Sequence, residues 1–220
     1  MTRVHLTRSR RSGARISPDL KLYACPVRDG DATMIGDLPV TTVARTVVDV
    51  ARHDDRTGWG FATGDRALRM GLTSVEELDE QLRRAARRPW IKLARQIVGL
   101  LDPLSESPGE SRSRWLMFQG GIPQPALQVD VPVMGGRVVY TPDFMWEEYG
   151  VLGEFDGDYK YDLVPGTDEW KARKRRDEAL QAEGWVIVHW AWEDLSNPVA
   201  FIATLRNAFL TARRLRERAS

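Results

Sequence analysis

The chain has 220 residues, of which 42% are hydrophobic and 29% are charged, so it is long enough for one large domain or two small ones. This composition excludes wholesale disorder and collagen-like repeats. No apolar run reaches the roughly 18 residues of a membrane span, and the first 15 residues lack the apolar stretch of a signal peptide. The single cysteine, Cys25, excludes a disulfide framework and a multi-cysteine zinc site. We therefore expect a soluble, cytoplasmic protein with no membrane association.

Charge is distributed unevenly along the chain. The net charge is +1, but residues 1–100 carry 18 Lys and Arg against 12 Asp and Glu, whereas residues 101–220 carry 14 against 19. The first 15 residues hold five arginines and no acid. A basic arm of this kind suits a polyanion, and it is equally typical of a solvated terminus.

In the first half, short apolar stretches that predict strands are followed by segments that predict helices. We therefore expect an α+β organisation for residues 1–103. Thr73 and Ser74 precede Glu76 and Glu77 at the spacing of a capping box, which is a helix start signal. The apolar periodicity and the turn residues together predict four helices, over residues 43–51, 61–70, 74–86 and 91–101.

Residues 102–109 contain two prolines, two serines and a glycine, and they are the best candidate for a linker. The pattern changes after them. Helices are expected over residues 110–119 and 168–184 and from residue 198 onward, and strands over residues 127–131, 137–140, 143–146, 150–156 and 185–190. The order from residue 110 onward is therefore α-β-β-β-β-α-β-α.

Four acids in the second half fall at special places in these predicted elements. Glu110 lies in the helix before the strands, Asp143 follows Pro142 at the start of a strand, and Glu154 and Asp156 end the next strand. Glu154 and Asp156 point to the same face because they are two residues apart. Asp143 and Glu154 converge if their strands are neighbours, and converging carboxylates repel one another unless a cation lies between them. Hard oxygen ligands of this kind suit Mg²⁺ or Mn²⁺, and such a metal polarises a phosphate and activates a water.

Three of these acids also have a structural explanation. Glu110 fits a capping box with a proline at the first helical position. Asp156 precedes a glycine, as in many hairpin turns, and Asp143 follows a proline, as turn residues commonly do. Glu154 is harder to explain in this way, because unpaired acids are seldom buried at the end of a strand.

Positive charges near the acids are candidates for contacts with a substrate. Lys160 lies four residues after Asp156 and can stabilise the negative charge that develops on a phosphate. We expect a basic run on the following predicted helix to bind nucleic acid: Lys171, Arg173, Lys174, Arg175 and Arg176. The net negative second half needs some phosphate-facing cations in order to approach DNA. Solvated surface charge is the alternative explanation for Lys160 and for this run.

The second half resembles the small PD-(D/E)XK nucleases that are related to the very short patch repair endonuclease. The resemblance covers residues 105–210, about half of the chain. Six pieces carry it in order: Ser107-Pro108-Gly109-Glu110-Ser111, Asp143-Phe144, Glu154-Phe155-Asp156-Gly157-Asp158-Tyr159-Lys160, Arg176-Asp177-Glu178-Ala179-Leu180, Gly184-Trp185 and Asp194-Leu195.

This resemblance implies an α/β fold for residues 104–220, with a central mixed sheet flanked by helices, and hydrolysis of DNA phosphodiester bonds with Mg²⁺ or Mn²⁺. Asp143 and Glu154 would be metal ligands, Asp156 a further ligand or a residue that orients water, and Glu110 would assist from its helix. Two departures matter for the chemistry. The family has His where this chain has Lys160, and a broader nuclease motif has Lys where Asp156 stands.

The first half resembles, more loosely, the region that precedes such nucleases in proteins labelled AbiEi-like antitoxins. The carriers are Val4-His5-Leu6-Thr7-Arg8, Leu38-Pro39-Val40-Thr41-Thr42, Ala44-Arg45-Thr46-Val47-Val48-Asp49-Val50-Ala51-Arg52 and Asp65-Arg66-Ala67-Leu68-Arg69. In those proteins a winged-helix DNA-binding segment comes first, and we expect this segment to be missing here. A structural scaffold is the alternative role for these helices.

Two functions from different classes follow from these observations. The first is a metal-dependent DNA endonuclease. The second is a non-catalytic DNA-binding or antitoxin-like regulator with a degenerate nuclease fold, which would have DNA or a protein as its partner. The histidines His5, His53 and His189 show no zinc-ligand spacing. His189 lies in a predicted strand; we expect a packed strand residue, and a side chain that faces the pocket is the alternative.

Overall fold

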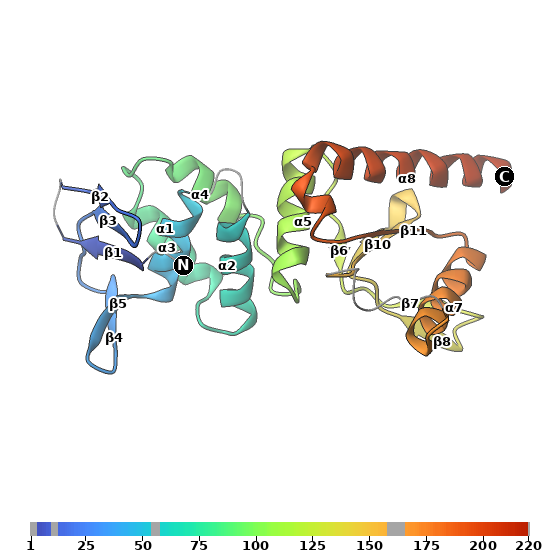
Figure 1. The fold of residues 1–220 in the computed structure, drawn as a ribbon, viewed down its shortest axis with the longest axis horizontal. Helices are drawn as coiled ribbons and strands as arrows, with labels where there is room; N and C mark the ends of the chain where they lie inside the picture. The colour runs from blue at the N-terminus through green and yellow to red at the C-terminus, as the bar shows by residue number, and fades with distance from the viewer. Residues whose placement is uncertain (1–3, 10–12, 54–57, 158–165, 220) are drawn as a thin grey trace. The chain divides into compact units, whose positions relative to one another are not determined.

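The structure is a computed structural model that describes residues 4–9, 13–53, 58–157 and 166–219 (Figure 1). The chain divides into two compact units, residues 1–46 and residues 47–220. The described residues form a mixed α/β structure with seven α-helices and several small sheets. No helix in this described part combines the length and the apolar character that a membrane span needs.

Unit 1 is a small β structure that leads into a helix. Its elements are β1 (Val4–Arg8), β2 (Arg15–Ile16), β3 (Leu20–Ala24), β4 (Ala32–Ile35), β5 (Leu38–Thr41) and the start of α1 (Val43–Ala51). The strand order of the first sheet is β1-β3-β2, and β4 and β5 form an antiparallel hairpin. A buried ion pair of 2.6 Å joins Arg45 of the helix to Asp31 at the hairpin. This pair fixes the helix start against the strands within the unit.

Unit 2 opens with a helical layer in which the predicted helices are confirmed to within a few residues. The layer contains the rest of α1, then α2 (Trp59–Arg69), α3 (Val75–Arg84), α4 (Ile91–Val98) and α5 (Pro108–Gln119). Ser74 caps α3 as the sequence predicts: its hydroxyl accepts from the amide of Glu77, whose carboxylate accepts from the amide of Ser74. Each partner satisfies a backbone donor that the first turn leaves open.

The boundary expected between residues 103 and 104 falls inside unit 2. Buried Asp65 of α2 accepts hydrogen bonds from the backbone amide of Asp102 and from the hydroxyl of Ser111, and it pairs with Arg114 at 3.0 Å. These contacts cross the predicted linker. Ser107, within the linker, is the N-cap of α5, so the stretch is a tight connection between packed helices.

The second part of unit 2 contains a four-stranded mixed sheet in the order β11-β10-β9-β6. Its strands are β6 (Ala126–Leu127), β9 (Phe144–Trp146), β10 (Val151–Phe155) and β11 (Val186–Trp190). Strands β10 and β11 are parallel, whereas β9 pairs antiparallel with both β10 and β6. The sequence-based expectation of a mixed sheet is therefore confirmed.

One predicted strand, over residues 127–131, is wrong. The chain leaves β6 at Gln128, which has a φ of 51°, a left-handed conformation that interrupts a strand. It re-enters a separate hairpin of β7 (Val131–Val133) and β8 (Val138–Tyr140). The observed order therefore has one more strand than the predicted α-β-β-β-β-α-β-α.

Two helices cover opposite faces of this sheet, α7 (Asp168–Ala182) on one and α8 (Pro198–Ala219) on the other (Figure 1). Side chains alternate along a strand. Accordingly Val151 packs in the core under α8 and α5, whereas Leu152 packs with Leu180 of α7. A Cβ on Gly153 would lie 2.6 Å from the Trp190 ring, so only glycine lets that indole fill the α8 core. Because of this alternation, one face of β10 packs against α7, the helix that contains the basic run.

Candidate functional site

The strand alternation puts three of the predicted acids, Asp143, Glu154 and Asp156, on the α7 face of the sheet. Glu154 is two residues from Leu152, which packs under α7, and it pairs in register with His189 of β11. Asp143 immediately precedes β9, and its carboxylate accepts a 2.8 Å hydrogen bond from the backbone amide of Phe155. This bond holds Asp143 beside the end of β10, as the sequence predicts for neighbouring strands.

The carboxylates of the predicted site share one electrostatic environment. Burial raises the pKa of Glu154 to about 7, and the negative charge of Asp143 adds to this shift. Burial also raises the pKa of Asp143, with a further contribution from Asp156. Burial raises the pKa of Glu110 on α5, and Asp143 again adds to the shift. Asp143, Glu154 and Asp156 therefore influence one another, and Glu110 joins them through Asp143.

Glu110 has a structural contact in addition to its place in this cluster. Its carboxylate accepts a 2.8 Å hydrogen bond from the backbone amide of Glu106, and its own amide donates to the hydroxyl of Ser107. Ser107 therefore caps α5, but the predicted capping box is not completed, because the carboxylate of Glu110 bonds the amide of Glu106 and not that of Ser107. One oxygen of Glu110 is committed to the backbone, which limits this residue to an assisting role.

Asp156 is held differently from Glu154, because cationic groups surround it. Its Oδ2 lies 2.5 Å from Nη2 of Arg173 and 3.0 Å from Nδ1 of His189. Burial alone would raise the pKa of Asp156, but the hydrogen bonds and charges of His189 and Arg173 bring it below its ordinary value. Asp156 is ionised and already paired.

His189 also belongs to the candidate site, although the sequence favoured a packed strand residue over one that faces the pocket. Its second ring nitrogen, Nε2, lies 3.1 Å from Oδ2 of Asp177 on α7, so the imidazole bridges two carboxylates. Burial opposes the charged ring, but the hydrogen bonds to Asp156 and Asp177 outweigh burial and raise the pKa of His189. A signal was present, since His189 is the polar residue of an apolar strand and shares the parity of Glu154 in the pairing register.

A second arginine of α7, Arg176, pairs with Glu154. Arg176 Nη2 lies 3.2 Å from Oε1 of Glu154, and Arg176 Nε lies 3.8 Å from Oδ1 of Asp177. Both side chains of the first pair are mostly buried, with exposed fractions of 28% for Arg176 and 12% for Glu154. This arginine partly offsets the effect of burial on the pKa of Glu154.

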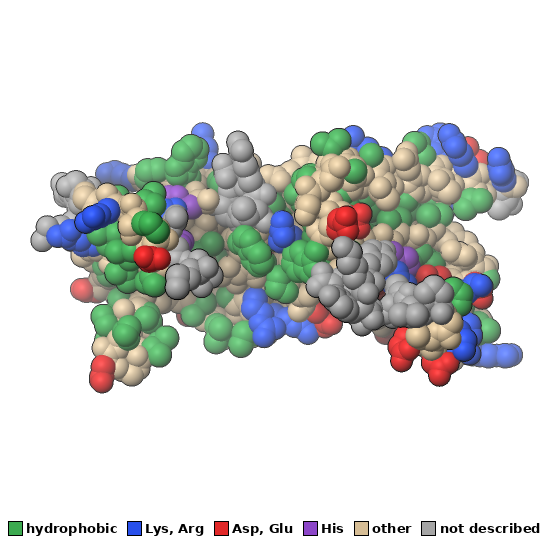
Figure 2. Space-filling view, viewed as in Figure 1, with side chains coloured by type: hydrophobic (Ala, Val, Ile, Leu, Met, Phe, Trp, Pro, Cys, Tyr) green, Lys and Arg blue, Asp and Glu red, His purple; other side chains and the backbone are tan. Residues whose placement is uncertain are grey.

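The basic run on α7 therefore divides by helix face. Arg173 and Arg176 point to the acids, whereas Lys171, Lys174 and Arg175 are exposed. Lys171 lies 3.3 Å from Asp168, and Lys174 lies 3.8 Å from Glu178. Acidic and basic side chains lie next to each other over the region of α7 in Figure 2. The predicted nucleic-acid contact of the run stays a prediction, which now concerns chiefly its three exposed members.

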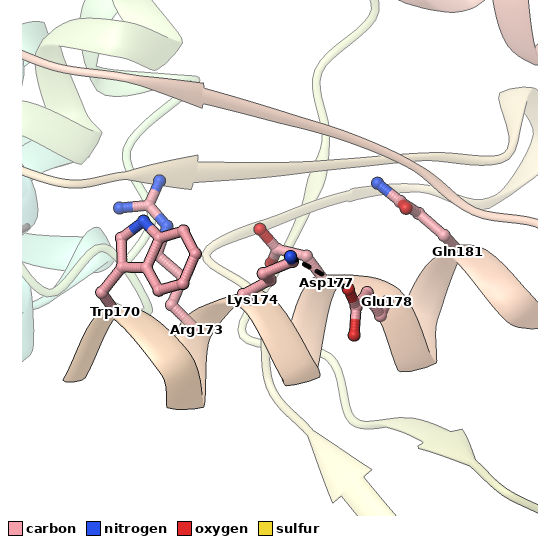
Figure 3. A pocket seen from close by; sticks show the side chains of 6 residues that line it. All are labelled: Trp170, Arg173, Lys174, Asp177, Glu178 and Gln181. Atoms are coloured by element: carbon pink, nitrogen blue, oxygen red, sulfur yellow. Dashed lines mark ion pairs between the residues drawn. The ribbon is translucent and has the colours of Figure 1, made fainter. Parts of the chain in front are cut away.

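A groove of about 430 Å³ follows one stripe of α7. Figure 3 shows the six side chains that line it: Trp170, Arg173, Lys174, Asp177, Glu178 and Gln181. Lys174 lies over the Trp170 ring, 5.4 Å from its centroid. Arg173 and Asp177 belong both to this groove and to the acid cluster, so the groove borders the site.

The donor set fits a hard divalent cation in its chemistry. Asp143, Glu154 and Glu110 supply carboxylate oxygens, which Mg²⁺ and Mn²⁺ prefer. Within the residues that the structure describes, no group of three or more acid, histidine or cysteine side chains is arranged to hold an ion. Arg176 takes up one of the carboxylates instead. Lys160 lies outside the described residues.

Comparison with known proteins finds relatives but no family. No protein-family model matches the chain, and no solved structure matches it significantly. The chain is similar to two proteins from strains of Mycobacterium tuberculosis, "Uncharacterized protein MT2308" and "Uncharacterized protein Rv2248". Each is 31% identical over 176 residues, an alignment that covers 80% of this chain and 63% of the relative. The chain thus spans less than two thirds of the length of these relatives, whose names state no activity.

Proposed function

We propose that this protein is a metal-dependent endonuclease that hydrolyses DNA phosphodiester bonds, and that residues 104–220 have a restriction-endonuclease-like fold. One observation carries the proposal. Glu154 at the end of β10 and Asp143 before β9 lie close enough that each charge raises the pKa of neighbouring acids: Asp143 raises that of Glu110 and of Glu154, and Asp156 raises that of Asp143 and of Glu154.

The energetics of this cluster favour a functional role. Burying a carboxylate without full compensation destabilises a fold, and mutual repulsion between carboxylates adds to the cost. Such perturbed acids concentrate at functional sites. The two arginines and the histidine of the site balance only part of the negative charge that these acids carry when ionised, and a divalent cation would offset the rest.

The residues divide into distinct roles under this proposal. Asp143 and Glu154 would hold the cation, with Glu110 assisting from α5. Asp156 departs from the ligand role that the resemblance implies, because Arg173 and His189 already hold it; it is better suited to orient a water or to position His189. A bound divalent cation supplies phosphate polarisation and an activated water.

Substrate contact would come from the exposed cations of α7. Lys171, Lys174 and Arg175 can reach phosphates on the outside of the helix, and Arg173 and Arg176 lie at the border with the acids. The lone cysteine agrees with action in a reducing compartment such as the cytoplasm. DNA is the expected partner, with a further protein partner if the first half acts as an antitoxin-like module.

The deciding experiment is nicking of supercoiled plasmid in Mg²⁺ or Mn²⁺, with EDTA as the blank. Glu154→Gln should lower the rate about 100-fold or more, because loss of a residue that only supports a metal ligand already costs about 10–100-fold and Glu154 would be a ligand itself. The matched control is Glu178→Gln, which removes an acid that is 60% exposed on α7 and should change the rate by less than about threefold. Equal nicking by both variants would contradict the assignment of the site.

A specific observation favours the non-catalytic alternative, a DNA-binding or antitoxin-like regulator with a degenerate nuclease fold. Asp156 stands where the nuclease motif has Lys, and arginines already neutralise two of the acids. For this alternative we expect salt-sensitive DNA retention that needs no divalent metal and survives Glu154→Gln, with no nicking under any condition.

A further inference from the structure

Two arginines one turn apart on α7 meet the acids of the site in different ways. Arg173 lies 2.5 Å from Asp156, which His189 also contacts. Arg176 lies 3.2 Å from Glu154 and 3.8 Å from Asp177. Within the described residues, the buried Nε of Arg176 and the buried Oδ1 of Asp177 make no hydrogen bond. The first arginine is firmly paired, whereas the second is held by charge with poor hydrogen-bond geometry.

The loosely held Arg176 contacts a buried carboxylate, that of Glu154, which has other acids close by. Glu154 is buried and lies near Asp143, which is half-buried. A buried carboxylate without a nearby positive charge is costly. In the absence of metal, the Arg176 guanidinium supplies that charge through its 3.2 Å contact with Glu154.

We propose that Arg176 is an internal counter-cation that competes with a divalent metal ion for Glu154 and, once displaced, contacts a phosphate of the substrate. This inference rests on the proposed function, and it names Arg176 as the residue that couples metal binding to DNA binding. A bound cation would neutralise Glu154, and the guanidinium of Arg176 would then be free to turn to a phosphate at the border of the site. A guanidinium pairs well with phosphate oxygens, so metal and DNA should each favour the binding of the other.

The test is isothermal titration of the full chain with Mn²⁺, comparing the parent with Arg176→Gln. Removing the competitor should tighten Mn²⁺ binding about tenfold. The matched control is Arg175→Gln, the same charge change at the neighbouring exposed position, which should alter the affinity by less than about twofold. Arg176→Lys, which keeps the charge but lacks the planar fork, should fall between the parent and Arg176→Gln, and circular dichroism confirms that each variant folds.

The outcomes separate this inference from the proposed function. Measurable Mn²⁺ binding that is equal in the parent and Arg176→Gln, or weaker in Arg176→Gln, overturns the competition and leaves the metal site standing. No Mn²⁺ binding by any of the folded proteins overturns the metal site and the inference together. Tighter binding by Arg176→Gln and Arg175→Gln alike reduces the effect to long-range charge and also overturns the inference.

A second readout tests the coupling to substrate. The anisotropy of a short labelled DNA duplex is measured with Ca²⁺, which occupies oxygen-ligand sites, and again with EDTA. Ca²⁺ should increase the DNA affinity of the parent several-fold, and the increase should be clearly smaller for Arg176→Gln. An equal increase in both proteins would show that the displaced arginine does not reach the phosphate.

Discussion

Asp65 and Glu154 are both buried acids of unit 2, and their carboxylates are satisfied to different degrees. Asp65, between α2 and α5, has an amide, a hydroxyl and a guanidinium within 3.0 Å of its carboxylate. Glu154, between β10 and α7, has a guanidinium at 3.2 Å and further carboxylates close by. Burial raises the pKa of both acids. Asp65 has a complete set of donors and joins two helices, whereas Glu154 has an incomplete set among like charges, as the proposed metal site requires.

The largest effect should come from breaking the satisfied acid. Asp65→Ala leaves Arg114 buried without its ion-pair partner and removes the acceptor for the amide of Asp102. We expect a loss of about 3–5 kcal/mol in the free energy of unfolding, as for other broken buried pairs. Urea denaturation measures this loss. A loss below about 1 kcal/mol would mean that the α2–α5 network does not anchor the helices.

Replacing Glu154 should have the opposite effect to replacing Asp65: at high pH it should increase the free energy of unfolding. The pKa of Glu154 rises in the fold from its ordinary 4.5 to about 7, so the folded chain binds a proton that the unfolded chain releases between these values. Stability from this residue is therefore present below about pH 4.5 and lost as the pH rises through 7. At 1.36 kcal/mol per pKa unit, the loss is about 3 kcal/mol.

Glu154→Gln removes this titration and keeps the shape of the side chain. Its free energy of unfolding relative to the parent should increase by up to about 3 kcal/mol between pH 5 and pH 9, because only the parent pays for ionising a buried carboxylate. Urea denaturation at the two pH values measures the difference. A difference that stays constant with pH would show that Glu154 is as well compensated as a surface acid.

The smallest effect concerns the exposed cations of α7. Lys174→Gln removes a charge whose ion pair with Glu178, at 3.8 Å, is weak and solvent-exposed. Folding stability should change by less than about 0.5 kcal/mol. If the helix contacts phosphates, DNA affinity should fall a few-fold and the salt slope of binding should drop by about 1. An unchanged slope would assign the lysine to ordinary surface charge.

The sequence predicts most elements of this fold because their boundaries depend on local chemistry. Ser74, Ser107 and Thr167 each cap the helix that follows them, and Gly184 follows α7 with a φ of 92°, as expected of a glycine after a helix end. The break at Gln128 could not be foreseen, because a glutamine in a left-handed conformation carries no compositional signal.

The candidate site divides in the same way between local and long-range information. The convergence of Asp143 and Glu154 follows from strand alternation and adjacency, which the sequence pattern reveals. The pairing of Asp156 with Arg173 joins residues 17 positions apart through a docked helix, and the bridge from His189 to Asp177 depends on the same docking. Such contacts depend on tertiary packing. The sequence alone therefore does not show which basic residues of α7 face the acids and which face the solvent.

The parallel pairing of β10 with β11 also determines when the site can exist during folding. Antiparallel neighbours join through a short hairpin, but parallel neighbours need a crossover, which here contains α7. Closing that long connection is a slow step compared with forming local turns. His189 and Arg176 therefore meet the carboxylates only once the crossover has closed. A nascent or partly unfolded chain carries the acids but not their arrangement, so any activity of the site is confined to the completed fold.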